Sequence, residues 1–183
     1  MRIASLLLAL LFPYAMAVAA SPEQQREDIM KLEKDTLTRL YRLQPAAEAA
    51  IKNSAGYAVF RNMGVKIFVA GGGTGKGVAV DRKTNKRTYM KMGEVQAGLG
   101  VGVKKFRVVF VFEDVGALEN FVNSGWEFGG QTTAAVTTGA DGAAIAGAVS
   151  VSPGVWMYQL TDAGLAAEVT VKGTKYWKDD ALN

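Results

Sequence analysis

The chain has 183 residues, 49% of them hydrophobic and 21% charged, which suits one globular domain with its own core. It contains no histidine and no cysteine, so imidazole and thiol catalysis, ordinary zinc sites, haem ligation and disulfides are excluded. The net charge of +4 hides a separation: residues 61–107 carry eleven basic and two acidic residues, whereas residues 108–183 carry three and nine.

Residues 1–20 are predicted to be a secretory signal. Arg2 gives a positive start, residues 3–12 are apolar except for Ser5, Pro13 ends this run, and small residues follow. An uncleaved anchor is the alternative, because residues 3–20 just reach spanning length. We expect a mature N-terminus between Val18 and Ser21 by intact-mass measurement and, without disulfides, a periplasmic location. A full-length chain in the membrane fraction would contradict this.

Residues 21–53 are predicted to form a helical segment ahead of a β-rich domain at residues 54–183. Ser21 followed by Pro22 is typical of a helix start, and apolar residues then recur at spacings of three and four up to Leu43. The opposite face carries charges of both signs, so packing against a sheet is favoured over an interfacial membrane helix. A second, short helix is predicted at residues 46–52.

Glycine dominates the predicted strands. All 21 glycines lie at or after position 56, and glycine occupies every second position in residues 71–77 and 98–102. Alternate residues of a strand point to opposite faces, so each run gives one nearly bare face. Such faces indicate a strongly curved sheet, with another layer or a ligand against the glycines.

The other elements follow from alternation and turn residues. Phe106, Val108, Phe110 and Phe112 point one way, which makes their strand a core element. Turns are predicted at 81–86, 103–105 and 139–142, and a helix at 114–123 capped by Asp114. Strands are predicted at 57–60, 65–80 as a bent pair, 87–92, 95–103, 106–112, 131–138, 143–151, 155–160 and 167–171. The predicted class is α+β, with N-terminal helices packed on a glycine-rich, strongly curved, largely antiparallel sheet that is barrel-like or a sandwich.

An ordered set of motifs runs through most of the chain. The motifs are Ala55–Phe60, Phe68–Gly72, Gly75–Val78, Gly98–Gly102, Val109–Phe112, Ala117–Phe121, Gly125–Gly129 and Val171–Lys175. Taken together, they resemble the SYLF domain family across residues 40–180, and the chain is similar to an exported bacterial-type member. The resemblance implies a lipid-binding module, known in eukaryotic endocytic proteins for phosphoinositide binding and actin regulation.

The basic centre of the chain supplies a candidate lipid-binding site. Its cations cluster at two predicted turns, at 81–86 and 103–105, and they converge if both turns lie at one end of the sheet. A cluster of this sign attracts anionic surfaces. The alternative is that these are solvated turns, partly neutralised by the acidic C-terminal part. The candidate residues are Arg82, Lys83, Lys86, Arg87, Lys104, Lys105 and Arg107.

No enzymatic activity and no cofactor are expected. The carboxylate pairs at residues 113–114 and 179–180 suit helix capping and solvation. The glycine run at 71–77 lacks the Ser or Thr that follows the lysine of a phosphate-binding loop, and a strand follows it. The leading partner is an anionic lipid or membrane surface. An envelope protein partner and an acyl chain enclosed against the glycine faces are the alternatives. Nucleic acid is not expected, because export and the lack of interleaved aromatics disfavour it.

Overall fold

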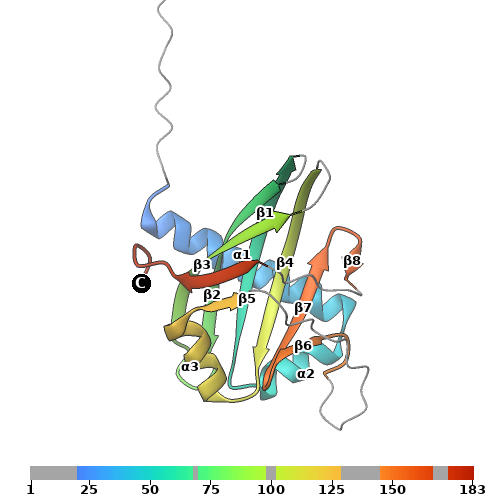
Figure 1. Cartoon of the computed structure of the whole chain (residues 1–183). Coiled ribbons are helices and arrows are strands. Elements are labelled where there is room, and N and C mark those ends of the chain that lie inside the picture. The colour runs from blue at the N-terminus through green and yellow to red at the C-terminus, as the bar shows by residue number, and fades with distance from the viewer. Residues whose placement is uncertain (1–19, 68–69, 98–101, 129–144, 167–172) are drawn as a thin grey trace, which may run out of the picture.

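The computed structural model describes residues 20–67, 70–97, 102–128, 145–166 and 173–183. The predicted signal, the predicted strands at 131–138 and 167–171 and most of the second glycine run therefore lie outside the described residues. Within them, helices lead and strands follow, which confirms the predicted α+β class (Figure 1). The elements are α1 (Pro22–Leu43), α2 (Ala46–Asn53), β1 (Gly56–Ile67), β2 (Ala70–Asp81), β3 (Arg87–Ala97), β4 (Gly102–Phe112), α3 (Val115–Ser124), β5 (Trp126–Phe128), β6 (Val149–Ser152), β7 (Val155–Thr161), β8 (Gly164–Leu165) and β9 (Thr174–Lys178).

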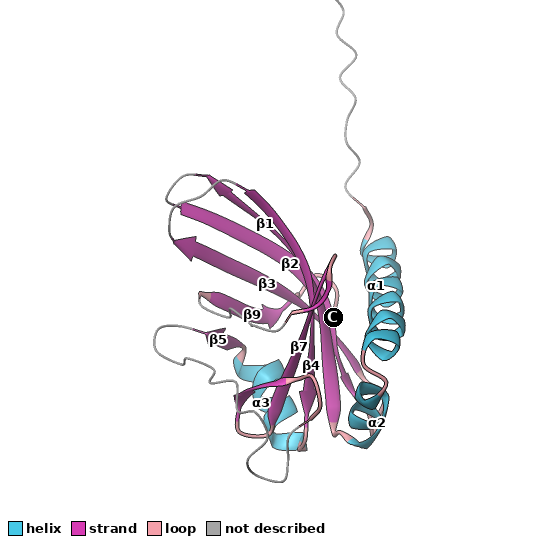
Figure 2. Ribbon diagram, turned by 90° about the vertical axis from the view of Figure 1, so that its right-hand side faces the viewer, coloured by secondary structure: helices cyan, strands magenta, loops and turns pink. Residues whose placement is uncertain are grey.

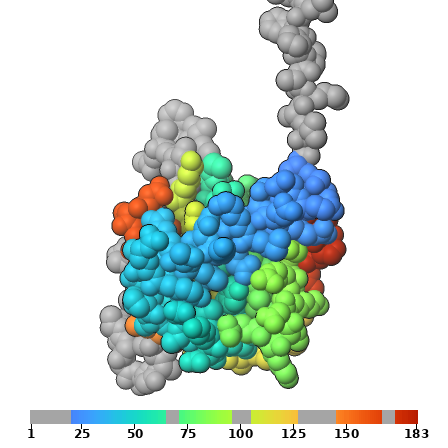
Figure 3. Space-filling model, turned by 180° about the vertical axis from the view of Figure 1, so that it is seen from behind, coloured from blue at the N-terminus to red at the C-terminus, as the bar shows by residue number. Residues whose placement is uncertain are grey.

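The described strands form one curled antiparallel sheet in the order β5-β9-β3-β2-β1-β4-β7-β6, with β8 paired to β7. Figure 2 shows this curl in profile, with α3 on its inner side and with α1 and α2 on its outer side. Seen from behind, α1 and α2 lie across the outer face (Figure 3). The two faces of the sheet therefore have separate hydrophobic cores.

Several strand boundaries differ from those predicted. β1 continues to Ile67 and pairs along its whole length with β2, so residues 65–67 of the predicted bent pair belong to the end of β1. β3 is continuous, and the turn predicted at 103–105 is wrong, because β4 already begins at Gly102. The charged residues Lys105 and Arg107 suggested a turn, but they alternate with Phe106 and Val108 and occupy outward positions of one strand. β5 and β9 are short and were not predicted.

The glycine face of β2 is packed against protein on the inner side of the curl. A Cβ atom at Gly75 would lie 2.6 Å from Cγ of Met92, and one at Gly77 would lie 2.7 Å from Cγ of Phe60. Phe60 in turn meets the ring of Tyr176 edge-on, with centroids 4.8 Å apart. Of the two predicted occupants of this face, a protein layer is therefore the one found at these positions.

α1 docks across part of the outer face of the sheet, as predicted (Figure 3). Ser21 Oγ accepts a hydrogen bond from Gln24 N at 3.2 Å and caps the helix. The buried Glu33 anchors the helix to the sheet: it accepts from Tyr57 OH at 2.6 Å and pairs with Arg87 at 3.4 Å. Burial, and then Glu33, raise the pKa of Tyr57 well above its usual range, so its hydroxyl keeps the proton. No helix among the described residues has the length and apolarity needed to cross a membrane.

Candidate functional site

Four cations lie side by side across four strands on the outer face of the sheet. Arg61 of β1 is directly opposite Lys76 of β2 and Arg107 of β4, and Lys76 is opposite Lys91 of β3. Directly opposite residues share a face of the sheet. Their face is the outer one, because Val59 and Val78, two positions away along β1 and β2, belong to the core beneath α1 and α2. We call Arg107, Arg61, Lys76 and Lys91 the cation row.

The cation row is only partly neutralised. Lys91 Nζ lies 2.7 Å from Asp179 Oδ1, Lys76 donates to the Gln25 side chain, and Arg107 Nη1 donates to Thr36 Oγ1 at 3.3 Å. Among the described residues, Lys91 is the one member with a carboxylate partner. Like charges directly opposite each other destabilise a sheet, and the row holds three such pairs. The row is therefore a concentrated positive site that an anion would stabilise.

Exposed apolar side chains flank the cation row. Trp177 of β9 stands directly opposite Lys91 and is 39% exposed. Met63, two positions beyond Arg61, is 54% exposed, and Val95 of β3 is 74% exposed. This part of the sheet thus combines positive charge with an aromatic ring and aliphatic groups, the combination that suits a membrane interface.

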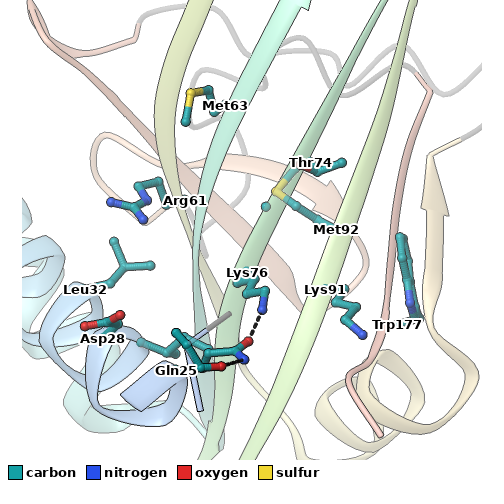
Figure 4. A pocket seen from close by; sticks show the side chains of 13 residues that line it. Gln25, Asp28, Leu32, Arg61, Met63, Thr74, Lys76, Lys91, Met92 and Trp177 are labelled. Atoms are coloured by element: carbon teal, nitrogen blue, oxygen red, sulfur yellow. Dashed lines mark hydrogen bonds between the residues drawn. The ribbon is translucent and has the colours of Figure 1, made fainter. Parts of the chain in front are cut away.

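Two pockets open on this face. The larger, of about 700 Å³, lies between the first half of α1 and strands β1 to β3, and Figure 4 shows its lining. The smaller, of about 270 Å³, lies beside β4 and the end of β7. Its lining includes four cations and one acidic residue, Asp162; the cations are Arg39, Arg61, Lys105 and Arg107.

The predicted site residues fall into two separate groups. Lys105 and Arg107 lie in β4, at the cation row and its smaller pocket, and Lys104 lies in β4 opposite Gly64. The turn after β2 and the first residue of β3 carry the other group, Arg82, Lys83, Lys86 and Arg87. That turn starts at Asp81, five residues along β2 from Lys76, or about 17 Å. The two groups therefore do not converge. The sequence hypothesis required both groups to lie at one end of the sheet, and they do not.

Within the turn group, the four residues differ in their surroundings. Arg87 pairs with the buried Glu33 and so helps to hold α1. Lys83 and Lys86 are exposed, and Asp81 Oδ1 accepts from the backbone N–H of Lys83 at 2.8 Å to shape the turn. Binding of lipid by the turn remains a prediction.

The carboxylate pairs have structural partners. Asp114 caps α3 by accepting from Ala117 N at 2.8 Å, as predicted, and Glu113 accepts from Trp156 Nε1 at 2.9 Å. Asp179 holds Lys91. No cluster of three or more metal-ligating side chains occurs among the described residues. The described residues thus present a charged and apolar surface as their main functional feature.

Arg61, Lys76 and Lys91 lie within the basic centre at residues 61–107 and Arg39 lies within the predicted helical segment, but none of them was among the candidate residues. The row depends on strand register, which joins residues far apart in the chain. One signal in the sequence could have indicated the row. Positions 61, 76, 91 and 107 recur at nearly equal intervals, and each interval is close to the combined length of one strand and one turn.

The chain is similar in sequence to known proteins. Residues 93–183 match the family model described as Ysc84, the Las17-binding protein actin regulator. Beta cell expansion factor A of Aeromonas veronii is 33% identical over 160 residues, which cover 87% of this chain. The same alignment covers 59% of that protein, so the chain spans about three fifths of the length of this curated relative.

Proposed function

The chain belongs, through residues 93–183, to the Ysc84 (SYLF) family, and we propose that it is a non-enzymatic module that binds anionic lipid headgroups through its cation row. The family is one of non-catalytic, lipid-binding and actin-regulating domains. The proposal goes further, to a particular face of this chain. A location in the periplasm, reached by the sequence-predicted signal, is part of the same proposal.

The observation that carries the proposal is the unbroken row Arg107, Arg61, Lys76 and Lys91, which ends at the exposed Trp177. Each lysine or arginine near an anionic bilayer contributes about 1 kcal/mol of attraction, and a ring at the interface adds contact area. Like-charge repulsion within the row is relieved when lipid phosphates approach it. A bilayer with anionic headgroups complements this face in both charge and polarity.

Vesicle flotation tests the proposal. We expect the purified protein to float with vesicles of phosphatidylcholine and phosphatidylglycerol at low salt, and to float weakly with phosphatidylcholine alone. High salt is expected to release the protein, because screening shortens the reach of surface charges to a few ångströms. Equal binding to both vesicle types, or binding that ignores salt, would contradict an electrostatic headgroup site.

A protein partner is the second candidate. The name of the family model refers to Las17 binding and actin regulation, and Met63, Val95 and Trp177 form exposed apolar groups that a protein surface could also cover. In the periplasm such a partner would be an envelope protein. Absence of vesicle binding at any salt concentration, together with a stable complex with an acidic envelope protein, would favour this alternative.

A further inference from the structure

The two pockets of the outer face share part of their lining. Arg61 and Met63 line both the pocket of about 700 Å³ and that of about 270 Å³. We propose that together they form a site for one anionic amphiphile, whose acidic head lies in the smaller pocket and whose acyl chain lies in the larger. This deepens the proposed lipid-binding function and rests on it.

The smaller pocket has the chemistry of an acidic headgroup site. Arg39 Nη2 donates to the carbonyl oxygens of Thr161 at 2.6 Å and Asp162 at 3.2 Å, which orients its guanidinium. Each guanidinium has five N–H donors, so Arg39 and Arg107 keep donors for an oxyanion after these bonds. No carboxylate of the described residues lies within 4.0 Å of the cationic groups of Arg39, Arg61 or Arg107.

The larger pocket offers apolar groups to an aliphatic chain. Ile29 and Leu32 of α1 line it, and Figure 4 shows Leu32 on one side and the partly exposed Trp177 on the other. The two lysines of the cation row and Asp28 line the pocket as well. Thr74 and Gly75 line the pocket, and at Gly93 a Cβ would lie only 3.2 Å from the Trp177 ring. A volume of about 700 Å³ is typical of small-molecule sites, which range over about 300–1,000 Å³.

The distance across the strands matches the length of one acyl chain, which favours one ligand over two unrelated ligands. From Arg107 on β4 to Trp177 on β9, the row crosses β1, β2 and β3. Four strand spacings amount to about 19 Å. One leaflet of a bilayer has hydrocarbon about 15 Å deep. An acyl chain that starts beside Arg61 therefore reaches the Trp177 end of the larger pocket.

Native mass spectrometry and calorimetry with three probes test this site. Lysophosphatidylglycerol supplies head and chain, monoacylglycerol supplies the chain alone, and glycerol phosphate supplies the head alone. We expect one molecule of lysophosphatidylglycerol per chain, bound at least about tenfold more tightly than either fragment. If glycerol phosphate binds as tightly as the whole amphiphile, the site serves free phosphates and the inference is overturned; equal binding of monoacylglycerol overturns it too.

Two tryptophan substitutions serve as a matched pair. Thr74→Trp fills the larger pocket from an exposed strand position and leaves the cation row intact, whereas Thr84→Trp lies in the exposed turn after β2. We expect Thr74→Trp to weaken lysophosphatidylglycerol binding about tenfold or more, and Thr84→Trp to bind like wild type. Unchanged binding in Thr74→Trp would overturn the inference.

Vesicle flotation of the same proteins separates this inference from the function on which it rests. If wild type floats but forms no complex with lysophosphatidylglycerol, the single-lipid site is refuted and the headgroup surface stands. If wild type neither floats nor forms the complex, both proposals fail.

Discussion

Reversing two charges of the cation row, in the double variant Lys76→Glu and Arg107→Glu, is expected to weaken binding to anionic vesicles about a hundredfold or more. The change takes the row from four positive charges to a net charge of zero. At about 1 kcal/mol for each charge near the surface, the lost attraction approaches 4 kcal/mol before screening. Flotation and vesicle titration at low salt measure this loss.

The same variant is expected to keep or gain stability. Glu at positions 76 and 107 turns the three like-charged pairs of the row into opposite-charged ones, each worth about 0.2–1 kcal/mol. Neither substitution removes the partner of a buried carboxylate, because Lys76 and Arg107 bond to Gln25 and Thr36. Weaker lipid binding together with an unchanged or higher denaturation midpoint excludes misfolding as the cause.

The matched control reverses the same amount of charge in the turn, as Lys83→Glu with Lys86→Glu. Both lysines are exposed, and neither has an ion-pair partner among the described residues. Arg87 is left unchanged because its loss would leave Glu33 buried and without a cation. We expect the control to keep most of its vesicle binding. If it loses binding and the row variant does not, the lipid site lies at the turn after β2, which is one of the two groups of residues proposed from the sequence.

Substituting valine for Gly77 is expected to destabilise the fold by about 3 kcal/mol or more. A Cβ at this position runs into the carbonyl oxygen of Val59 and the ring of Phe60, with Cγ of Phe60 only 2.7 Å away. A backbone oxygen of a paired strand cannot move aside without breaking the ladder. Because domains are stable by only about 5–15 kcal/mol, folding itself could fail.

Gly72→Ala in the same strand is the matched control. Gly72 is exposed, and its Cβ would meet the Glu94 carbonyl oxygen at 3.4 Å, an ordinary contact. We expect this variant to lie within about 0.5 kcal/mol of wild type in denaturant melts. Gly73→Val should fall between the two, at about 2 kcal/mol, because its nearest neighbour is the Asn62 side chain, at 2.7 Å. Equal melts for all three would show that the inner face is not closely packed.

Local signals allowed the helices and one strand to be predicted from the sequence. Ser21 and Asp114 cap their helices as expected, because a cap depends on residues only three positions apart. The strand ending at Phe112 was recognised by its alternating apolar residues, since four of them line one face. These features need no knowledge of which strands are neighbours.

The strand ends and the cation row could not be predicted in the same way. Lys105 and Arg107 alternate with inward apolar residues, so local polarity alone did not distinguish an exposed strand face from a turn. The row also requires β1 to lie between β2 and β4, a pairing that the order of strands in the chain does not specify. Of the predicted site residues, Arg107 belongs to the cation row and Lys105 lines the smaller pocket beside it, whereas the place of Arg61 in the row emerged only from the strand register.

Site-specific labelling tests most directly whether the outer face meets the lipid. The chain has no cysteine, so Met63→Cys beside the cation row and Lys83→Cys in the turn each provide one attachment point for an environment-sensitive fluorophore. Met63 is 54% exposed, and Lys83 is exposed as well. With phosphatidylglycerol vesicles, the label at position 63 is expected to shift to the blue and to be quenched by lipid-borne quenchers, while the label at position 83 remains in water. A response at position 83 with none at position 63 would contradict the assignment of lipid binding to the cation row.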